Sequence, residues 1–196
     1  MIRKLLVANR GEIAVRIIRT CKEMGITSVA VHSVGDKEAL HVNLADEAIC
    51  IGPDNPLQSY LNMNNIIQAA CSSGCDAIHP GFGFLSENPK FAKLVEECGL
   101  IFVGPNHELI SMLGDKNEAR LQMENIGVPV IPGTKNVIEN VEEGLLEAEK
   151  IGYPVIIKAS SGGGGKGMRI VWDSSDFIEN FNTAKSEAKV SFNDDR

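Results

Sequence analysis

Short apolar runs alternate with amphipathic segments of helical length over about the first hundred residues, and this alternation limits the fold more than any other feature. A strand, a helix and a second strand in succession form a right-handed crossover between parallel strands. The pattern therefore predicts an α/β fold in which a doubly wound parallel sheet carries helices on both faces. The expected strands are 3–8, 28–33, 47–52, 76–81 and 100–105, and the expected helices are 13–24, 61–74 and 89–98.

Two of these helices carry clear boundary signals. The helix over 13–24 repeats its apolar residues at helical spacing, and Gly25 follows as a C-terminal cap. The helix over 89–98 has Asn88 as its N-cap and Pro89 in its first turn. Its apolar face is predicted to contain Phe91, Leu94, Val95 and Cys98.

The alternation of expected strands and helices ends at Pro105. Helices are expected first over 106–113 and 115–127, the second with Asp115 and Glu118 spaced as in a capping box. The two prolines in 128–133 favour an extended connection rather than a central strand. Next come a helix (139–151), two strands (153–159 and 168–172), and a last helix capped by Ser174 or Ser175 that buries Phe177, Phe181 and Ala184.

These patterns divide the chain into three parts. We expect a doubly wound α/β domain over 1–112, a connecting helix over 113–130 and an incomplete α+β unit over 131–196. A unit of this last size with two or three strands has little core of its own, so it reads as part of a larger domain.

The stretch KASSGGGGKGMR, residues 158–169, is the strongest candidate for a ligand-binding loop. A Walker P-loop is excluded because Ser160 stands where the first glycine is required and Gly167 stands where Ser or Thr is required. Gly162, Gly164 and Gly167 do spell G-x-G-x-x-G, but a strand-like segment follows instead of the helix that a Rossmann motif needs. A glycine-rich hairpin whose N–H groups fold over phosphates remains, and a ligand-free surface hairpin is the alternative.

Composition excludes several function classes. A formal net charge of −7 without a basic cluster argues against nucleic acid as the main partner. Apolar runs are too short to span a membrane, and the N-terminus lacks a signal peptide, so we expect a cytoplasmic protein without a membrane partner. The odd count of five cysteines indicates buried, unpaired thiols in a reducing compartment. Cys71 and Cys75 lack the second ligand pair that a zinc site requires, so no metal site is predicted in this chain.

Four segments together resemble the N-terminal part of biotin carboxylase, a family of ATP-grasp ligases. They are KLLVANRGEIAVRIIR (4–19), HPGFGFLSEN (79–88), GDKNEAR (114–120) and YPVIIKASSGGGGKGMR (153–169), and the resemblance covers residues 2–196. It implies a doubly wound, Rossmann-like pre-ATP-grasp domain followed by part of a small lid domain that carries the glycine flap. It also implies an enzyme that uses MgATP to activate bicarbonate as carboxyphosphate and carboxylates biotin on a carrier protein.

The resemblance assigns roles to a few residues. Lys116 and Lys158 would contact ATP phosphates, and the backbone amides of Gly163, Gly164 and Gly165 would close over them. Lys116 lies in the first turn of its expected helix, where a cation is disfavoured unless an anion binds beside it; a solvated lysine balanced by Asp115 and Glu118 is the alternative.

Phe82 would lie beside biotin, at a position often occupied by tyrosine in the family. For His79 we favour a hydrogen-bonded structural role. Glu87 is interpreted as complementing the N-terminus of the next helix.

The sequence departs from the family pattern in two further ways. Ser161 replaces the first of the five glycines that often form the flap. The family's magnesium ligands, bicarbonate-binding residues and catalytic base belong to a C-terminal domain, so no catalytic residue and no magnesium ligand is assigned within these 196 residues, and the chain alone is expected to be inactive.

The resemblance also implies partners: a biotin carboxyl carrier protein or domain, a carboxyltransferase, and a second copy in a homodimer. The helix bearing Arg16, Arg19 and Glu23 is a candidate dimer surface; a solvated face with an Arg19–Glu23 pair is the alternative. The acceptor stays open between acetyl-CoA, as in fatty acid biosynthesis, propionyl-CoA and pyruvate. Two other hypotheses are another bicarbonate-activating ligase of the carbamoyl-phosphate type and a non-catalytic nucleotide-binding module.

Overall fold

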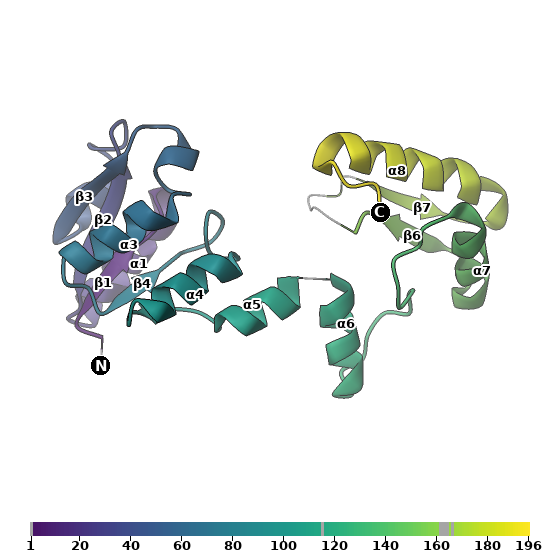
Figure 1. Cartoon of the computed structure of the whole chain (residues 1–196), viewed down its shortest axis with the longest axis horizontal. Helices are drawn as coiled ribbons and strands as arrows, with labels where there is room; N and C mark the ends of the chain where they lie inside the picture. Colours follow the sequence, from purple (N-terminus) through teal and green to yellow (C-terminus); the bar gives the residue numbers. More distant parts are fainter. Residues whose placement is uncertain (1, 115, 161–164, 166) are drawn as a thin grey trace. The chain divides into compact units, whose positions relative to one another are not determined.

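The computed structural model describes residues 2–114, 116–160, 165 and 167–196. The chain divides into two compact units, Met1–Gly114 and Asp115–Arg196, and each is described by itself (Figure 1). None of the helices in the described ranges is long and apolar enough to cross a lipid bilayer.

The first unit is built on a five-stranded parallel sheet with the strand order β3-β2-β1-β4-β5, which confirms the predicted doubly wound topology. Its strands are β1 (Lys4–Val7), β2 (Thr27–Ser33), β3 (Glu47–Gly52), β4 (Ala77–His79) and β5 (Ile101–Phe102). The fifth strand is shorter than the expected 100–105. The helical elements of this unit are α1 (Gly11–Glu23), α2 (Leu40–Leu44), η1 (Pro56–Gln58), α3 (Met63–Ser72), α4 (Pro89–Glu97) and α5 (His107–Gly114).

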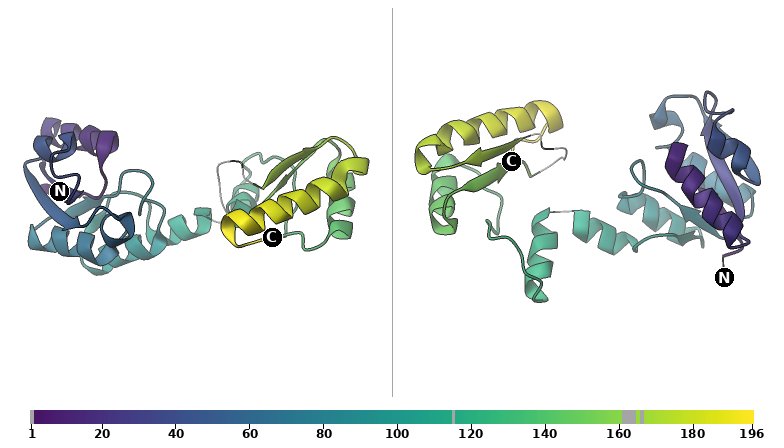
Figure 2. Two further views of the ribbon diagram at one scale, coloured as in Figure 1. Left: turned by 90° about the horizontal axis from the view of Figure 1, so that it is seen from above. Right: turned by 180° about the vertical axis from the view of Figure 1, so that it is seen from behind.

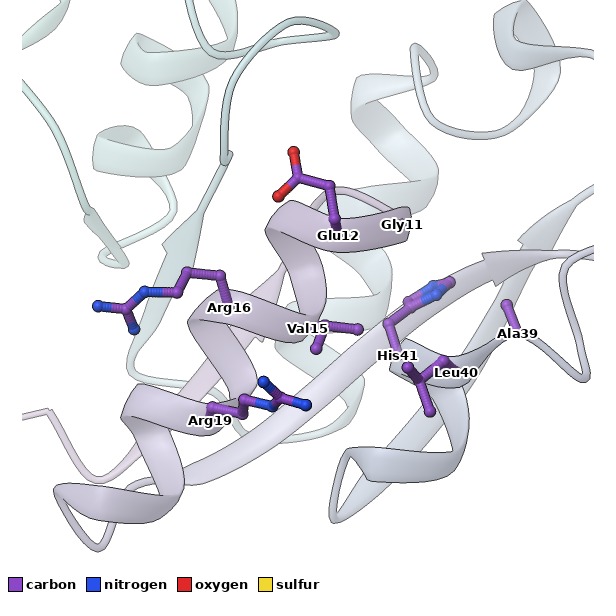
Figure 3. Close-up of a pocket in the computed structure, with 8 residues that line it drawn as sticks. All are labelled: Gly11, Glu12, Val15, Arg16, Arg19, Ala39, Leu40 and His41. Carbon is purple, nitrogen blue, oxygen red and sulfur yellow. The ribbon is translucent and has the colours of Figure 1, made fainter.

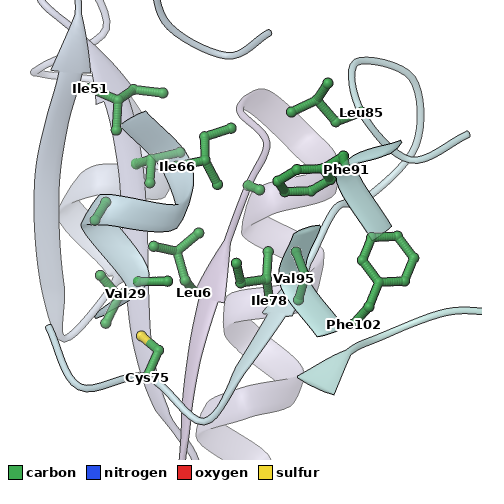
Figure 4. Packing of buried hydrophobic residues seen from close by; sticks show 14 of the residues in the cluster. Leu6, Val29, Ile51, Ile66, Cys75, Ile78, Leu85, Phe91, Val95 and Phe102 are labelled. Atoms are coloured by element: carbon green, nitrogen blue, oxygen red, sulfur yellow. The ribbon is translucent and has the colours of Figure 1, made fainter. Parts of the chain in front are cut away.

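Successive side chains of β1 point to opposite faces of the sheet and belong to two separate hydrophobic cores. Leu6 joins the cluster beneath α3 and α4, whereas Leu5 and Val7 join the cluster beneath α1. Figure 4 shows the first cluster, in which the Phe91 and Phe102 rings meet edge to face with their centroids 6.1 Å apart. Because successive side chains of a strand point to opposite faces, a buried central strand must be apolar throughout.

The predicted helix boundaries hold at both positions that carried signals. The Asn88 side chain accepts a hydrogen bond from the Phe91 N–H at 3.1 Å, so it caps α4. Gly25 follows the end of α1 with a φ of +68°, the left-handed conformation expected of a glycine at this place.

All five cysteines are free, but the prediction that they are buried is wrong for three of them. Cys21 and Cys75 are buried, whereas Cys50, Cys71 and Cys98 are exposed. Cys98 is the C-cap residue of α4, so it lies beyond the buried face that Phe91 and Val95 define. Cys50 belongs to β3, an edge strand whose residues are largely exposed.

The second unit pairs two antiparallel strands with helices. Figures 1 and 2 show α8 lying along the β6–β7 hairpin. No strand forms over 128–133, which confirms the extended connection. Its elements are α6 (Lys116–Asn125), α7 (Val141–Ile151), β6 (Val155–Lys158), β7 (Met168–Val171), η2 (Ser174–Asp176) and α8 (Phe177–Phe192).

The predicted serine cap of the last helix is wrong. Asp173 accepts the Ser175 N–H at 2.9 Å and caps a short 3₁₀ turn, and α8 then begins without a side-chain cap. Ser174 and Ser175 lie inside that turn, where Ser175 donates its hydroxyl to Asp173 instead of accepting from the helix. The other predicted cap, Asp115, lies outside the described residues.

A small core holds this unit together. Ala148, Val171 and Phe177 are its buried members, and Phe177 stacks on Phe181 with 5.9 Å between ring centroids. A Cβ at Gly144 of α7 would lie 2.9 Å from the Phe177 ring. The core therefore depends on a position without a side chain.

Replacing Gly144 with alanine tests this dependence. Helix propensity alone favours alanine by about 1 kcal/mol, whereas overpacking a core costs about 1–3 kcal/mol. Because Phe177 is only 3% exposed and cannot swing into solvent, we expect a net loss of stability for the second unit. Urea unfolding measures the free energy of unfolding of the variant and of the wild type. Gly114→Ala is the matched control, since a Cβ there meets nothing within 4 Å. Equal or higher stability of Gly144→Ala would contradict the packing.

Candidate functional site

The glycine stretch joins two antiparallel strands. Ile157 pairs with Arg169 and Lys158 pairs with Met168, so the loop closes a hairpin as the sequence predicted. This excludes the strand-to-helix turn of both the Walker and the Rossmann motifs. Gly163 and Gly164, two of the predicted phosphate-binding glycines, and Ser161 lie outside the described residues.

Two glycines at the end of the loop have structural reasons. Gly165 has a φ of +80° and is exposed, a conformation that a side chain rarely adopts. Gly167 has a φ of +67°, and a Cβ there would lie 2.9 Å from the Cβ of Ala159. Its carbonyl accepts the Ala159 N–H at 3.0 Å. Gly167 thus closes the hairpin against α8, a role that the sequence analysis missed.

The two faces of the hairpin differ in what covers them. The inner face sends Val155, Ile157 and Val171 into the core beneath α7 and α8. The outer face is apolar and exposed: Ile156, Met168 and Ile170 are 51%, 38% and 55% exposed, and Trp172, which continues the alternation of β7, is 69% exposed.

Lys158 lies on this outer face at the end nearest the glycine loop. It follows Ile156 by two residues and lies opposite Met168 across the hairpin. Its side chain is exposed, and among the described residues no carboxylate forms an ion pair with it.

This arrangement suits a ligand with a flat apolar part and an anionic tail. Aliphatic side chains can pack on an aromatic base, while a lysine and loop N–H groups bind phosphate oxygens. Lys116, the other predicted phosphate ligand, opens α6, but its side chain lies outside the described part of the chain. Within the described ranges, no group of three or more His, Cys, Asp or Glu side chains is placed to hold a metal ion.

A second polar cluster lies at the carboxyl edge of the first unit's sheet, where open α/β sheets bind ligands. The Nδ1 of His79 accepts the Gly81 N–H at 3.0 Å, and burial lowers the pKa of the imidazole. His79 is therefore neutral with its proton on Nε2, which agrees with the structural role expected of it. Glu87 is exposed and precedes the Asn88 cap.

Phe82 lies in the loop that follows β4 and is 60% exposed. Asn9, which is separated from β1 by Ala8, holds this loop: its Nδ2 donates to the carbonyl oxygens of Pro80 at 2.7 Å and Phe82 at 2.8 Å. Asn9 is not among the site residues predicted from the sequence. Its position just past a central parallel strand was the available signal.

Arg10 contacts the same loop through Phe84. Its guanidinium carbon lies 5.2 Å from the centroid of the Tyr60 ring and 5.6 Å from that of Phe84, and these two rings are stacked. Its Nη1 also lies 3.1 Å from Asp36. Burial works to raise the pKa of Asp36, but hydrogen bonds from Tyr60, Arg10 and Ser33 outweigh it and hold the pKa below its usual value.

The surface of α1 carries a shallow pocket of about 420 Å³ that includes the predicted dimer residues Arg16 and Arg19 (Figure 3). Leu40, on its far side, is exposed. The Arg19–Glu23 ion pair of the alternative interpretation, a solvated helix face, does not form in the described part of the chain. Arg16 instead donates to the hydroxyl of Thr20.

Comparison with known families agrees with this architecture. Residues 1–110 match the family model described as "Biotin carboxylase, N-terminal domain". Residues 115–196 match the model described as "Carbamoyl-phosphate synthase L chain, ATP binding domain". The first match covers more than half of the chain.

Individual relatives extend this result. The chain is 55% identical over 192 residues to biotin carboxylase 1 of Bacillus subtilis, covering 98% of this chain and 43% of that protein. A crystal structure of a biotin carboxylase–β-γ-ATP complex from Campylobacter jejuni matches with a TM-score of 0.91 and 45% identity, over 100% of this chain and 44% of that one. The biotin carboxylase domain dimer of Hydrogenobacter thermophilus 2-oxoglutarate carboxylase, solved with MgADP, ADP and bicarbonate, matches with a TM-score of 0.88 and 47% identity, over 100% and 43%.

The chain thus spans less than half the length of these relatives, and within that span it shares 45–55% of its residues with them and matches the two solved structures with TM-scores of 0.91 and 0.88. It belongs to the biotin carboxylase family.

Proposed function

We propose that this chain forms the N-terminal α/β domain and the nucleotide-covering hairpin of a biotin carboxylase. The complete enzyme uses MgATP and bicarbonate to carboxylate biotin on a carrier protein. The observation that carries the proposal is the outer face of the hairpin, where exposed Ile156, Met168 and Ile170 adjoin Lys158, which forms no ion pair with any residue that the structure describes.

The residues present fit a nucleoside triphosphate. We assign the aliphatic outer face to the base, and Lys158 with the amide of Gly165 to the phosphates. Lys116, Gly163 and Gly164 are assigned to the phosphates by resemblance alone. Bound MgATP supplies the phosphoryl group that activates bicarbonate; the chain's own contribution is to bind, orient and cover it.

Phe82 is assigned to the biotin side of the enzyme. It is exposed on a loop at the carboxyl edge of a parallel sheet, which supports contact with a ligand. A phenyl ring in place of tyrosine keeps the packing surface and loses only the hydroxyl.

The three-part division of the chain stays a proposal. We assign 1–112 to the α/β domain, 113–130 to a connecting helix and 131–196 to the hairpin lid. The break between residues 114 and 115 falls inside the proposed connection, and α6 occupies much of it.

Partners follow from the proposed reaction. We propose a biotin carboxyl carrier protein or domain and a carboxyltransferase, in the cytoplasm, with acetyl-CoA as one candidate acceptor. We also propose a homodimer through the α1 surface, supported by the exposed Arg19 and Leu40 and by the dimeric domain of the Hydrogenobacter relative.

The carbamoyl-phosphate type of ligase is the second candidate, because the model that matches residues 115–196 carries that name. Residues 1–110 favour biotin carboxylase instead. Stimulation of ATP use by free biotin separates the two reactions.

The first test is bicarbonate-dependent ADP release with magnesium and free biotin. We expect no turnover from the 196-residue chain and biotin-stimulated turnover from the complete reading frame that contains it, because the resemblance places the catalytic base and metal ligands elsewhere. Turnover by the short chain would overturn that assignment. Absence of activity from both proteins would favour the non-catalytic binding module.

Lys158→Gln tests the phosphate assignment in the complete gene product. A hydrogen bond to a charged group contributes about 1.5–3 kcal/mol, so kcat/KM for ATP should fall roughly 10- to 100-fold. Lys150→Gln is the matched control, since Lys150 pairs with Glu147 on the exposed side of α7. Equal kcat/KM values for the two variants would remove Lys158 from the nucleotide site.

Arg19→Glu tests the dimer surface. Reversing a charge at an interface places like or unpaired charges together, so we expect the dimer dissociation constant of the complete gene product to rise about tenfold or more. Sedimentation velocity measures the shift to monomer. Lys90→Glu, an exposed charge reversal on α4, should leave the dissociation constant unchanged. A dimer that tolerates Arg19→Glu as well as Lys90→Glu would place the interface elsewhere.

A further inference from the structure

The loop Pro80–Ser86 combines an exposed aromatic residue with an unusually constrained backbone. Gly81 and Gly83 have φ values of +68° and +66°, and Phe84, which is not glycine, has a φ of +40°. A left-handed conformation in a bulky residue is held only when the surroundings impose it. Strain of this kind clusters at functional sites.

Asn9 holds the backbone of the first half of the loop in place. Its side-chain amide donates to two loop carbonyls, and its Oδ1 accepts the Arg10 N–H at 2.9 Å, so every hydrogen-bonding group of this buried side chain is used. A Cβ at Gly81 would lie 2.7 Å from the Asn9 Nδ2, so only glycine fits there.

Arg10 holds the second half of the loop in place through Phe84. Phe84 stacks on Tyr60 with 5.1 Å between ring centroids and 9° between ring planes, and the Arg10 guanidinium lies close to both rings. Asp36 fixes the guanidinium, and it also accepts the Tyr60 hydroxyl at 2.7 Å. Arg10 therefore connects the segments that follow β1, β2 and β4.

The side chain of Arg10 remains 43% exposed, so its removal opens no cavity in the core. It also does not cap α1, although it occupies the N-cap position. The Arg10 side chain contacts Asp36, Tyr60 and Phe84. Phe84 belongs to the loop, and Tyr60 is the ring on which Phe84 stacks, so these two residues define where the loop lies.

We propose that Arg10 is a positioning residue: by holding Phe84 against Tyr60 it fixes the neighbouring Phe82 in one orientation at the carboxyl edge of the sheet, where biotin is bound. The effect on biotin rests on the proposed function, and specifically on the assignment of Phe82. The effect on the loop does not.

The test uses the complete gene product with four variants: Phe82→Ala, Arg10→Gln, the double variant, and Arg10→Lys. We expect KM for free biotin to rise about three- to tenfold in each single variant Phe82→Ala and Arg10→Gln. The double variant should match Phe82→Ala, because the two residues act through one ring. Arg10→Lys should recover part of the loss, since lysine keeps the charge beside Asp36 but lacks a planar face.

Two further readouts separate positioning from general damage. In Arg10→Gln, bicarbonate-dependent ATP hydrolysis without biotin should stay within about twofold of the wild type, because Arg10 has no assigned role in it. The Gly81 amide, which donates to His79, and the Ser86 amide, which donates to the carbonyl oxygen of Gly83, should exchange with solvent about tenfold faster in Arg10→Gln. Lys93→Gln, which removes an exposed cation from α4, is the control for both.

The outcomes distinguish the two proposals. A raised KM in Phe82→Ala with an unchanged KM in Arg10→Gln overturns the role of Arg10 and leaves Phe82 in place. An unchanged KM in Phe82→Ala overturns the biotin assignment of Phe82, and with it the role of Arg10 toward biotin. If the wild type shows no biotin-stimulated activity, amide exchange decides: faster exchange in Arg10→Gln supports the positioning of the loop, and unchanged exchange overturns it.

Discussion

The central position of β1 in the parallel sheet is the constraint on which the first unit depends. β1 bonds to β2 on one side and to β4 on the other, so its side chains must be apolar on both faces and its end lies where the chain reverses its winding. The residues that follow, Asn9 and Arg10, are consequently the first that can reach the loops after both neighbours. One binds the loop after β4 from within the core, and the other ties it to Tyr60 and Asp36.

The second unit is stabilised in a different way. A two-stranded hairpin has little stability by itself, so one face must be covered. Ala148 of α7 and Phe177 of α8 form a core with Val171 of β7 on that face. The opposite face keeps Ile156, Met168 and Ile170 exposed to solvent beside a lysine. Exposed apolar surface rimmed by charge is characteristic of a binding surface. The same alternation of residues thus builds the core and the exposed face to which we assign the nucleotide.

Several features of both units could be predicted from local chemistry. The parallel strands, the Asn88 cap, the Gly25 cap and the glycine hairpin all depend on residues close together in the chain, where periodicity and backbone preference act directly. Where two local solutions competed, prediction failed. Asp173 caps the turn in place of Ser174 or Ser175, and Cys98 lies past the buried face of α4 although the periodicity includes it.

The amino-acid sequence by itself determined the winding of the sheet, the hairpin around the glycine loop and the family. Each of these follows from the spacing of residues and the order of segments along the chain. Only the tertiary structure revealed that Asn9 and Arg10 hold the Phe82 loop, and that Gly167 and Gly144 are sites of close packing. These facts join residues more than seventy positions apart, as with Asn9 and Phe82, or depend on a neighbouring helix, as with Gly167 and Ala188. The physical reason is that contacts between distant segments form only once the sheet and its helices have packed, and no local pattern records them.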